Sequence, residues 1–270
     1  MKRPAHFAML LLLCIFCLGP LLWQLVTSLK PNETLTTLPP ILPDRLTMDH
    51  YISVLAERSF VKCMANSAGV AAMTTVLSLG IGSLCAFALA KLRTPFKAAV
   101  LGFVLSASMF PPIATVSPLY LIIRGLGLRD TLWALVLTYT SFSLPLSIWI
   151  LTNFFRQIPD EIHRAARVDG CSPFQCFYRI MLPLSLPGLF TTAILVFIFS
   201  WNEFLFALTF TATEASRTVP VAIALFPGVH EIPWGEIAAA SVTVTLPVIA
   251  AVFAFQKRIV EGLTAGAVKG

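Results

Sequence analysis

Six long apolar runs divide the chain, and they constrain its fold more than any other feature. They lie at about residues 7–29, 64–90, 98–122, 132–153, 185–208 and 235–255. Each run is near the roughly 20 residues that a helix needs to cross a bilayer. Only 12% of residues are charged, about half the share of a soluble domain, because charge within a membrane is costly. The sequence therefore predicts an all-α polytopic membrane protein with six transmembrane helices, in a single membrane domain over residues 1–270.

The first run has two readings. It follows a basic start, Lys2 and Arg3, so a cleaved signal peptide has to be considered. The apolar stretch is longer than a typical signal-peptide core, and no clear small-x-small cleavage site precedes Lys30. We interpret the run as a retained span at the edge of a core that is formed by the other five.

Lysine and arginine residues predict the orientation, because they are enriched in cytoplasmic loops. With the N-terminus inside, twelve of the 19 lie in inner segments and seven in outer segments. Both termini, the polar loop at about 154–184 and the tail 256–270 are thus expected in the cytoplasm. These loops also account for the net charge of +6, and no arginine-rich face or stacking module indicates nucleic-acid binding.

Catalytic and cofactor motifs are missing from the sequence. It contains no Gly-x-x-x-x-Gly-Lys-Ser/Thr loop, so the chain is not expected to bind or hydrolyse ATP. The histidines are scattered over segments predicted on opposite sides of the membrane, and the six cysteines have no convincing metal spacing. Cys14 and Cys17 have the spacing of a redox pair, but inert buried thiols are expected in the middle of a span. We expect neither an enzyme nor a bound cofactor or metal in this chain.

The polar segment between the fourth and fifth runs is the most informative loop. Pro159 can open a short helix, and the two acids that follow it suit the positive end of that helix. Gly170 permits a sharp turn that other residues resist. Ser172 can then cap a second short helix, with Pro173 at its first position.

The spacing within this segment resembles a known motif. Two adjacent alanines, a glycine four residues on and Ile-x-Leu-Pro after nine more residues are typical of the EAA loop in membrane permease subunits of ABC importers. In that family the loop docks a separate ATPase. The resemblance implies a set of ATPase-coupling residues: Arg164, Ala165, Ala166, Asp169, Gly170, Ile180, Leu182 and Pro183. Arg164 stands where the family has Glu, so either the partner carries a compensating acid or Arg164 points to solvent.

Other stretches resemble the carbohydrate branch of the family, of the maltose and trehalose type. They are Trp201-Asn202-Glu203-Phe204, Trp234-Gly235-Glu236 and the last ten residues. The resemblance implies a type I ABC importer permease fold in a bacterial inner membrane, and a disaccharide substrate such as trehalose or maltose. Another glycoside or a glycerol-linked sugar is the alternative. The implied partners are membrane lipid, a second homologous permease, an outer sugar-binding protein and an ATPase dimer that binds ATP and Mg.

Three neighbouring residues form a candidate substrate path. Glu203 is the one acid clearly within an apolar run, where a polar residue lines a cavity or pairs with a partner. Asn202 could hydrogen-bond a sugar hydroxyl, and Trp201 could stack on a sugar face. The alternative is a helix-packing contact.

The resemblance also implies that the tail, with Thr264, Gly266, Lys269 and Gly270, contacts the ATPases.

Prolines inside the predicted spans leave a further choice open. They include Pro111, Pro112, Pro118, Pro145 and Pro247. Each removes a backbone hydrogen bond and can kink its helix. Such breaks either serve packing or line a translocation path.

A self-sufficient secondary transporter would need inverted repeats and intramembrane ion-coupling acids, and neither is visible in the sequence. A membrane enzyme would need paired acids or metal ligands within its spans.

Overall fold

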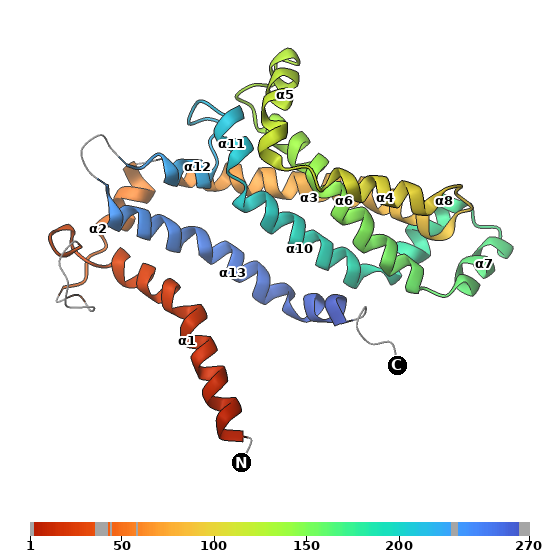
Figure 1. Cartoon of the computed structure of the whole chain (residues 1–270), viewed down its shortest axis with the longest axis horizontal. Coiled ribbons are helices and arrows are strands. Elements are labelled where there is room, and N and C mark those ends of the chain that lie inside the picture. The colour runs from red at the N-terminus through yellow and green to blue at the C-terminus, as the bar shows by residue number, and fades with distance from the viewer. Residues whose placement is uncertain (1–2, 36–42, 44, 58, 228–231, 265–270) are drawn as a thin grey trace. The chain divides into compact units, whose positions relative to one another are not determined.

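The chain folds into helices, as its apolar runs predict (Figure 1). A computed structural model describes residues 3–35, 43, 45–57, 59–227 and 232–264, of which 3–5, 57 and 257–264 are described by their backbone alone. The long elements of the described residues are α1 (Arg3–Ser28), α3 (Phe60–Lys91), α4 (Lys97–Ala107), α5 (Pro112–Gly125), α6 (Leu132–Gln157), α10 (Leu186–Asn202) and α13 (Trp234–Thr264). The short elements are η1 (Asn32–Thr34), α2 (Asp49–Ile52), η2 (Ser53–Glu57), α7 (Asp160–Val168), α8 (Pro173–Cys176), η3 (Phe177–Met181), α9 (Leu182–Leu184), α11 (Leu205–Phe210) and α12 (Val219–Ala224).

Helix length and hydropathy fit a polytopic membrane protein. Among the described residues, α1, α3, α6 and α13 are each long and apolar enough to cross a membrane. Two bent helix pairs raise the number to six if each pair counts as one span. The residue composition of α1 suits lipid contact, since its apolar side chains are exposed over most of its length.

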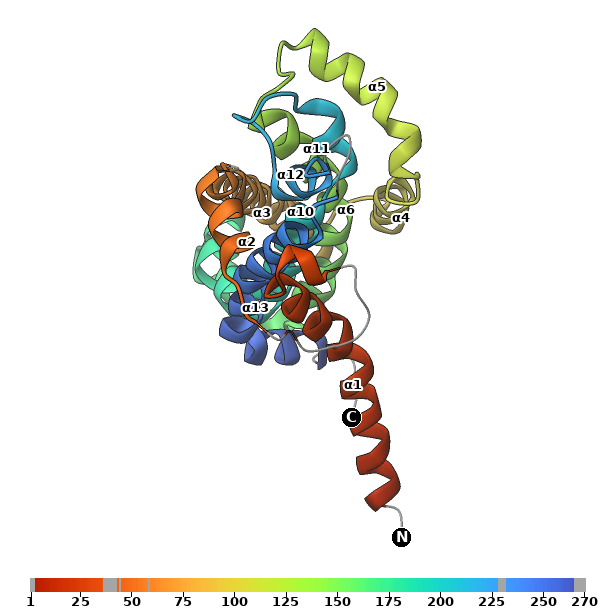
Figure 2. The same ribbon diagram turned by 90° about the vertical axis from the view of Figure 1, so that its left-hand side faces the viewer.

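The third and fifth apolar runs are interrupted helices. The third is split into α4 and α5, which meet at 89° (Figure 2). Pro111 stops the helix there, because proline lacks an N–H group and disfavours helical backbone in the residue before it. The fifth run ends as a helix at Asn202, and the short α11 follows after a break. By contrast, Pro118, Pro145 and Pro247 lie inside helices that continue past them.

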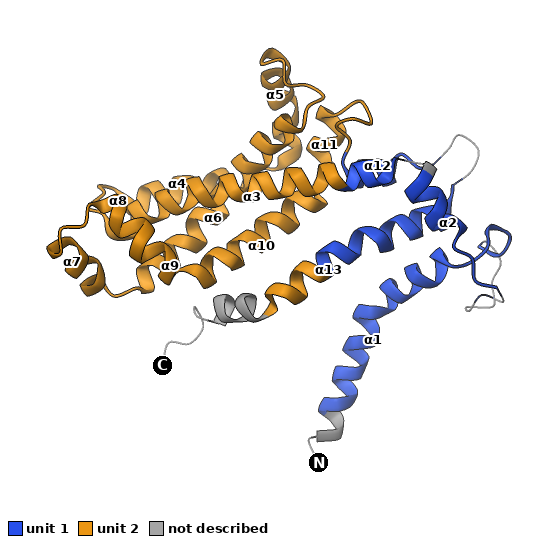
Figure 3. Ribbon diagram, turned by 180° about the vertical axis from the view of Figure 1, so that it is seen from behind, with its two compact units in different colours: residues 1–64, 218–249 blue, residues 65–217, 250–270 orange. Residues whose placement is uncertain are grey.

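The chain packs as two compact units, coloured separately in Figure 3. Unit 1 comprises residues 1–64 and 218–249. Its core joins the start of α3, α12 and the first turns of α13, and consists of Val54, Phe60, Cys63, Val219, Ala222, Phe226, Ala239 and Ala240. The ring of His50 lies so close to Gly235 that a Cβ there would be 2.2 Å from His50 Nε2, so this helix start requires glycine. Glu236 lies in the first turn of α13, as expected, and accepts a 3.0 Å hydrogen bond from Ser53.

Unit 2 comprises residues 65–217 and 250–270. Within it α6 is the central helix and packs on α4, α10 and α11. A second core gathers the C-terminal ends of α3 and α6 with the short helices α7 and α8, and consists of Ala86, Phe87, Leu151, Phe155, Ala166, Cys176, Phe177 and Met181. This core fixes the base of the polar segment that the sequence singled out. The prediction of one membrane domain over the whole chain stays a prediction.

Candidate functional site

The two-helix turn, residues 159–172, has the local geometry that the sequence predicts. Pro159 precedes α7, and Gly170 has a left-handed backbone with φ of +85°. Cys171 N donates to Ala166 O at 3.0 Å, and Gly170 N donates to Arg167 O at 3.3 Å. This is the pair of hydrogen bonds with which a glycine closes a helix C-terminus, since glycine adopts positive φ at no steric cost.

The helix after the turn begins with a capping box. Gln175 N donates to Ser172 Oγ at 3.2 Å, and Ser172 N donates to Gln175 Oε1 at 2.7 Å. Pro173 occupies the first helical turn. These reciprocal bonds satisfy two backbone donors that a helix start would otherwise leave free. The predicted cap and proline are therefore confirmed.

A buried lysine ties the two-helix turn to the end of α3. Lys91 Nζ donates to Ile158 O at 2.5 Å and to Asp160 Oδ1 at 2.6 Å, and the lysine side chain is only 2% exposed. The hydrogen bond and positive charge of Lys91 hold the pKa of Asp160 below its usual range. Lys91 is therefore a polar link between α7 and α3, beside the ring contact between His163 of α7 and Phe87 of α3, whose centroids are 6.0 Å apart. This role of Lys91 was not predicted, although a lysine at the end of an apolar run was a usable signal.

The two alanines of the predicted coupling set differ in exposure. Ala165 is exposed, whereas Ala166 is 4% exposed and belongs to the unit 2 core. Ala166 therefore packs inside this chain, whereas Ala165 is accessible from outside it. Ile180 and Leu182 also pack against that core, while Arg164, Asp169, Gly170 and Pro183 are exposed.

Two exposed apolar side chains flank the turn and were not singled out as docking residues. Val168 is 87% exposed and Phe174 is 63% exposed. Arg164 lies between them and the start of α7, where it forms a 2.7 Å ion pair with Glu161. Both side chains of that pair are at least 70% exposed. The turn thus presents a small apolar surface with an adjoining ion pair.

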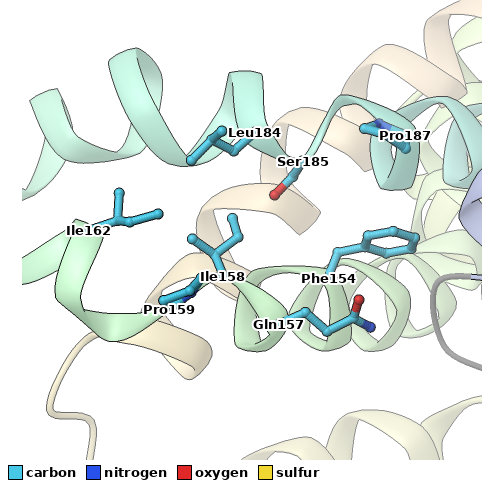
Figure 4. Close-up of a pocket in the computed structure, with 8 residues that line it drawn as sticks. All are labelled: Phe154, Gln157, Ile158, Pro159, Ile162, Leu184, Ser185 and Pro187. Atoms are coloured by element: carbon cyan, nitrogen blue, oxygen red, sulfur yellow. The ribbon is translucent and has the colours of Figure 1, made fainter. Parts of the chain in front are cut away.

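A pocket of about 350 Å³ opens beside the base of α7 (Figure 4). It is lined by the end of α6, the start of α7 and the junction of α9 with α10, through Phe154, Gln157, Ile158, Pro159, Ile162, Leu184, Ser185 and Pro187. Ser185 is 1% exposed, and its hydroxyl has no hydrogen-bond partner among the described residues. The base of the two-helix turn is therefore a concave, mainly apolar surface.

Comparison with known proteins identifies the family. The model described as "Binding-protein-dependent transport system inner membrane component" matches residues 78–264, which include the two-helix turn. The chain belongs to this family of ABC importer permeases.

Relatives match the permease along its whole length. The trehalose transport system permease protein SugB of Mycobacterium tuberculosis is 44% identical, with 100% of this chain and 99% of that protein covered. The trehalose/maltose transport system permease protein MalG of Thermococcus litoralis is 43% identical, with 100% and 98% covered. A solved bacterial ABC transporter that imports alginate has a chain with a TM-score of 0.81 at 23% identity, and 95% of each chain is covered. That structural match shows the permease fold.

The predicted substrate triad of the permease makes contacts within its own helices. Glu203 lies between α10 and α11, and its carboxylate accepts hydrogen bonds from Phe206 N at 2.9 Å and Ala207 N at 3.2 Å. Trp201 is 3% exposed and stacks on Phe197, with ring centroids 5.7 Å apart. Asn202 Nδ2 donates to a backbone carbonyl of its own helix at 2.8 Å. A direct role of the triad in sugar binding stays a prediction.

A carboxylate between α5 and α6 organises the clamped loop, residues 211–217. Asp130 accepts hydrogen bonds from Ala212 N at 2.7 Å, Thr213 N at 3.0 Å, Thr213 Oγ1 at 2.8 Å and the hydroxyl of Ser216. These bonds, with that of Ser216 first, hold the pKa of Asp130 well below its usual range. Asp130 itself has φ of +61°, which an acidic residue tolerates better than most.

An amide from α3 holds the same loop. Asn66 Nδ2 donates to Ala215 O at 3.0 Å and to Arg217 O at 2.9 Å. Asp130 accepts hydrogen bonds from N–H and hydroxyl groups of the clamped loop, and Asn66 donates to its backbone carbonyls. The two side chains therefore hold the donors and the acceptors of the same loop. Neither residue carries a local signal in the sequence.

Of the predicted tail residues, Thr264 is described by its backbone alone, and Gly266, Lys269 and Gly270 lie outside the described residues.

Proposed function

We propose that this permease is the membrane subunit of an ATP-driven importer of a disaccharide such as trehalose or maltose. The observation that supports this substrate class is the end-to-end similarity to two permeases named for trehalose, at 44% and 43% identity. Another glycoside or glycerol-linked sugar is the second candidate, because the sulfoquinovosyl glycerol transport system permease protein SmoH of Agrobacterium fabrum is 38% identical over 99% of this chain.

The permease works with other chains in this proposal. A second homologous permease completes the translocation path, and an outer sugar-binding protein delivers the substrate. A dimer of separate ATPases binds ATP and Mg and drives the cycle, since the sequence itself has no phosphate-binding loop. The excess of lysine and arginine in the inner segments supports a cytoplasmic position for both termini and for the two-helix turn.

The two-helix turn is the ATPase-docking element in this proposal. Its support is geometric: α7 is closed by a rigid glycine turn, exposes Val168 and Arg164, and is joined to α3 by Lys91. A push on α7 is thereby passed to a membrane-spanning helix without unfolding of the turn. We further propose that residues 264–270 contact the ATPases, on the basis of the family resemblance of the tail.

Reconstituted uptake tests this function. The permease, its second permease, the ATPases and the binding protein are placed in proteoliposomes, and ATP-dependent uptake of labelled trehalose, maltose and a glycerol-linked sugar is compared. A ligand screen on the binding protein runs in parallel. We expect uptake of a neutral disaccharide that requires ATP and every subunit. Uptake that persists without the ATPases would instead indicate a secondary transporter.

A further inference from the structure

A second pocket lies within unit 2, at the sharp bend between α4 and α5. It has a volume of about 430 Å³ and is closed on one side by α6. The bend of 89° falls inside the predicted third span. Non-helical backbone at membrane depth is tolerated where it is buried in protein or lines a polar cavity. The break between α4 and α5 therefore lines a cavity as well as serving packing.

Aromatic rings form part of the pocket wall. Phe103 and Phe110 contribute from the bend and are 77% and 64% exposed, and Phe142 contributes from α6. Phe206 packs against Phe142, with ring centroids 5.0 Å apart. Because Glu203 caps the helix that carries Phe206, Glu203 acts on this wall as a positioning residue.

The lining is mainly apolar and also includes hydroxyl-bearing residues. Ser106, Ser108, Thr115 and Ser141 each donate their proton to a backbone carbonyl of their own segment at 2.7–2.9 Å. A hydroxyl oxygen that has donated its proton still carries acceptor lone pairs. The pocket thus offers several hydrogen-bond acceptors, and a polyhydroxylated ligand brings the donors that match them.

The lining carries no charged side chain among the described residues. An anionic ligand would lose its hydration there without gaining a cation, which is costly in a membrane interior. A neutral sugar loses less, because its CH faces can lie on the rings while its hydroxyls reach the polar oxygens.

We propose that this pocket is a sugar-contact site of the translocation path and that it favours neutral sugars over acidic ones. The inference rests on the proposed function as a sugar importer. It assigns the contact to the α4–α5 bend and α6, rather than to the Trp201–Glu203 stretch of α10.

The test uses two conservative variants in the full complex, each with a matched control. Phe110→Leu removes a ring and keeps an apolar side chain, and Ser141→Ala removes an acceptor. Phe253→Leu changes a ring on α13 that is similarly exposed, at 65%. Ser241→Ala removes a hydroxyl that makes the same type of backbone bond, at 2.7 Å, outside this pocket.

The readout is labelled trehalose transported per ATP hydrolysed, at saturating sugar-loaded binding protein, with complex assembly measured by size-exclusion chromatography. We expect both pocket variants to assemble normally and to lower this ratio by about fivefold, the effect of one net hydrogen bond in Ser141→Ala and of one aromatic contact in Phe110→Leu. We expect the control variants to leave it unchanged. The wild type should carry trehalose in preference to a uronic-acid disaccharide.

Two results overturn the pocket assignment while sugar transport stands. An unchanged ratio in both variants would exclude sugar contact at the bend. A loss of assembly with the second permease would show that a helix of that partner fills the pocket. If the wild-type complex transports no neutral sugar, both the proposed function and the pocket assignment are wrong. This outcome is distinguishable from the other two, because it is seen in the wild-type measurement without any variant.

Discussion

The two-helix turn and the clamped loop are both short connections in unit 2, but they are held in different ways. Hydrogen bonds within the two-helix turn join residues that are three to five positions apart in the sequence. The clamped loop is held by Asp130, 82 to 86 positions away, and by Asn66, 149 to 151 positions away. The shape of the two-helix turn therefore depends on neighbouring residues, whereas the shape of the clamped loop depends on the helices around it.

This difference predicts how each region responds to change. The two-helix turn is linked to α3 by the polar bonds of Lys91 and by the apolar core that holds Ala166 and Phe87, so a displacement of α7 is passed to α3. The clamped loop cannot move without breaking bonds to two other segments. We therefore expect variants in the turn to affect coupling, and variants of the clamp to affect stability.

The largest effect is expected for Asp130→Ala. The variant removes four hydrogen bonds to the clamped loop, with a loss of about 4 kcal/mol if each is worth about 1 kcal/mol net. Thermal unfolding and limited proteolysis of the loop measure it. Asp130→Asn is the control, because asparagine tolerates the positive φ and keeps one acceptor oxygen. An unchanged midpoint in Asp130→Ala would show that the loop is held by other contacts.

The clamp should also be insensitive to ordinary changes of pH. The folded pKa of Asp130 lies below its usual value of about 3.9, so its stabilisation is complete above that value and is lost only as the pH falls through the lowered pKa. Protease resistance of the clamped loop should therefore be constant between about pH 5 and pH 8. A loss of resistance near pH 6 would require a different titrating group.

Lys91→Met tests the polar link between the two-helix turn and α3. It leaves the carbonyl of Ile158 without this donor, at a cost of about 1–3 kcal/mol. We expect ATP hydrolysis to continue while uptake falls, because α7 loses its polar link to α3 and keeps only the apolar contacts. Lys91→Arg, which keeps the charge, should retain more uptake. Parallel loss of both activities would mean that the lysine supports assembly and not coupling.

Gly170→Val tests the local design of the turn. The position has φ of +85° and open space for a Cβ, so the cost is backbone strain of about 1–3 kcal/mol. Uptake per ATP should fall at normal membrane expression. Gly170→Asn should be milder, because asparagine adopts this conformation more readily. Equal uptake in the wild type and Gly170→Val would remove the turn from the mechanism.

Arg164→Glu should have the smallest effect on the isolated permease. The ion pair with Glu161 is exposed, and such pairs contribute about 0–1 kcal/mol. A strong assembly defect with the ATPases, restored by an opposite charge on the ATPase, would place Arg164 in the docking surface. Normal assembly would show that Arg164 is solvated and that the turn docks through its apolar side chains.

Local rules were enough to predict the caps and the turn. The geometry at three positions depends only on groups within a few residues, and it can therefore be predicted from the sequence. These positions are Gly170, Ser172 and Pro173. The same rules could not separate Ala165 from Ala166, since only the core of α3, α6 and α8 decides which alanine is buried. The break after Asn202 and the partners of Glu203 were likewise invisible, because apolar composition does not show where a helix within a membrane run ends.

The sequence by itself determined the helical membrane class, the family and the two-helix turn, because hydropathy, motif spacing and capping depend on neighbouring residues. Tertiary structure alone decided that Lys91 joins α7 to α3, that Asp130 and Asn66 share one loop, and that rings and hydroxyls from the α4–α5 bend and α6 face one pocket. Those contacts connect residues far apart in the chain, and they exist only after the helices have packed.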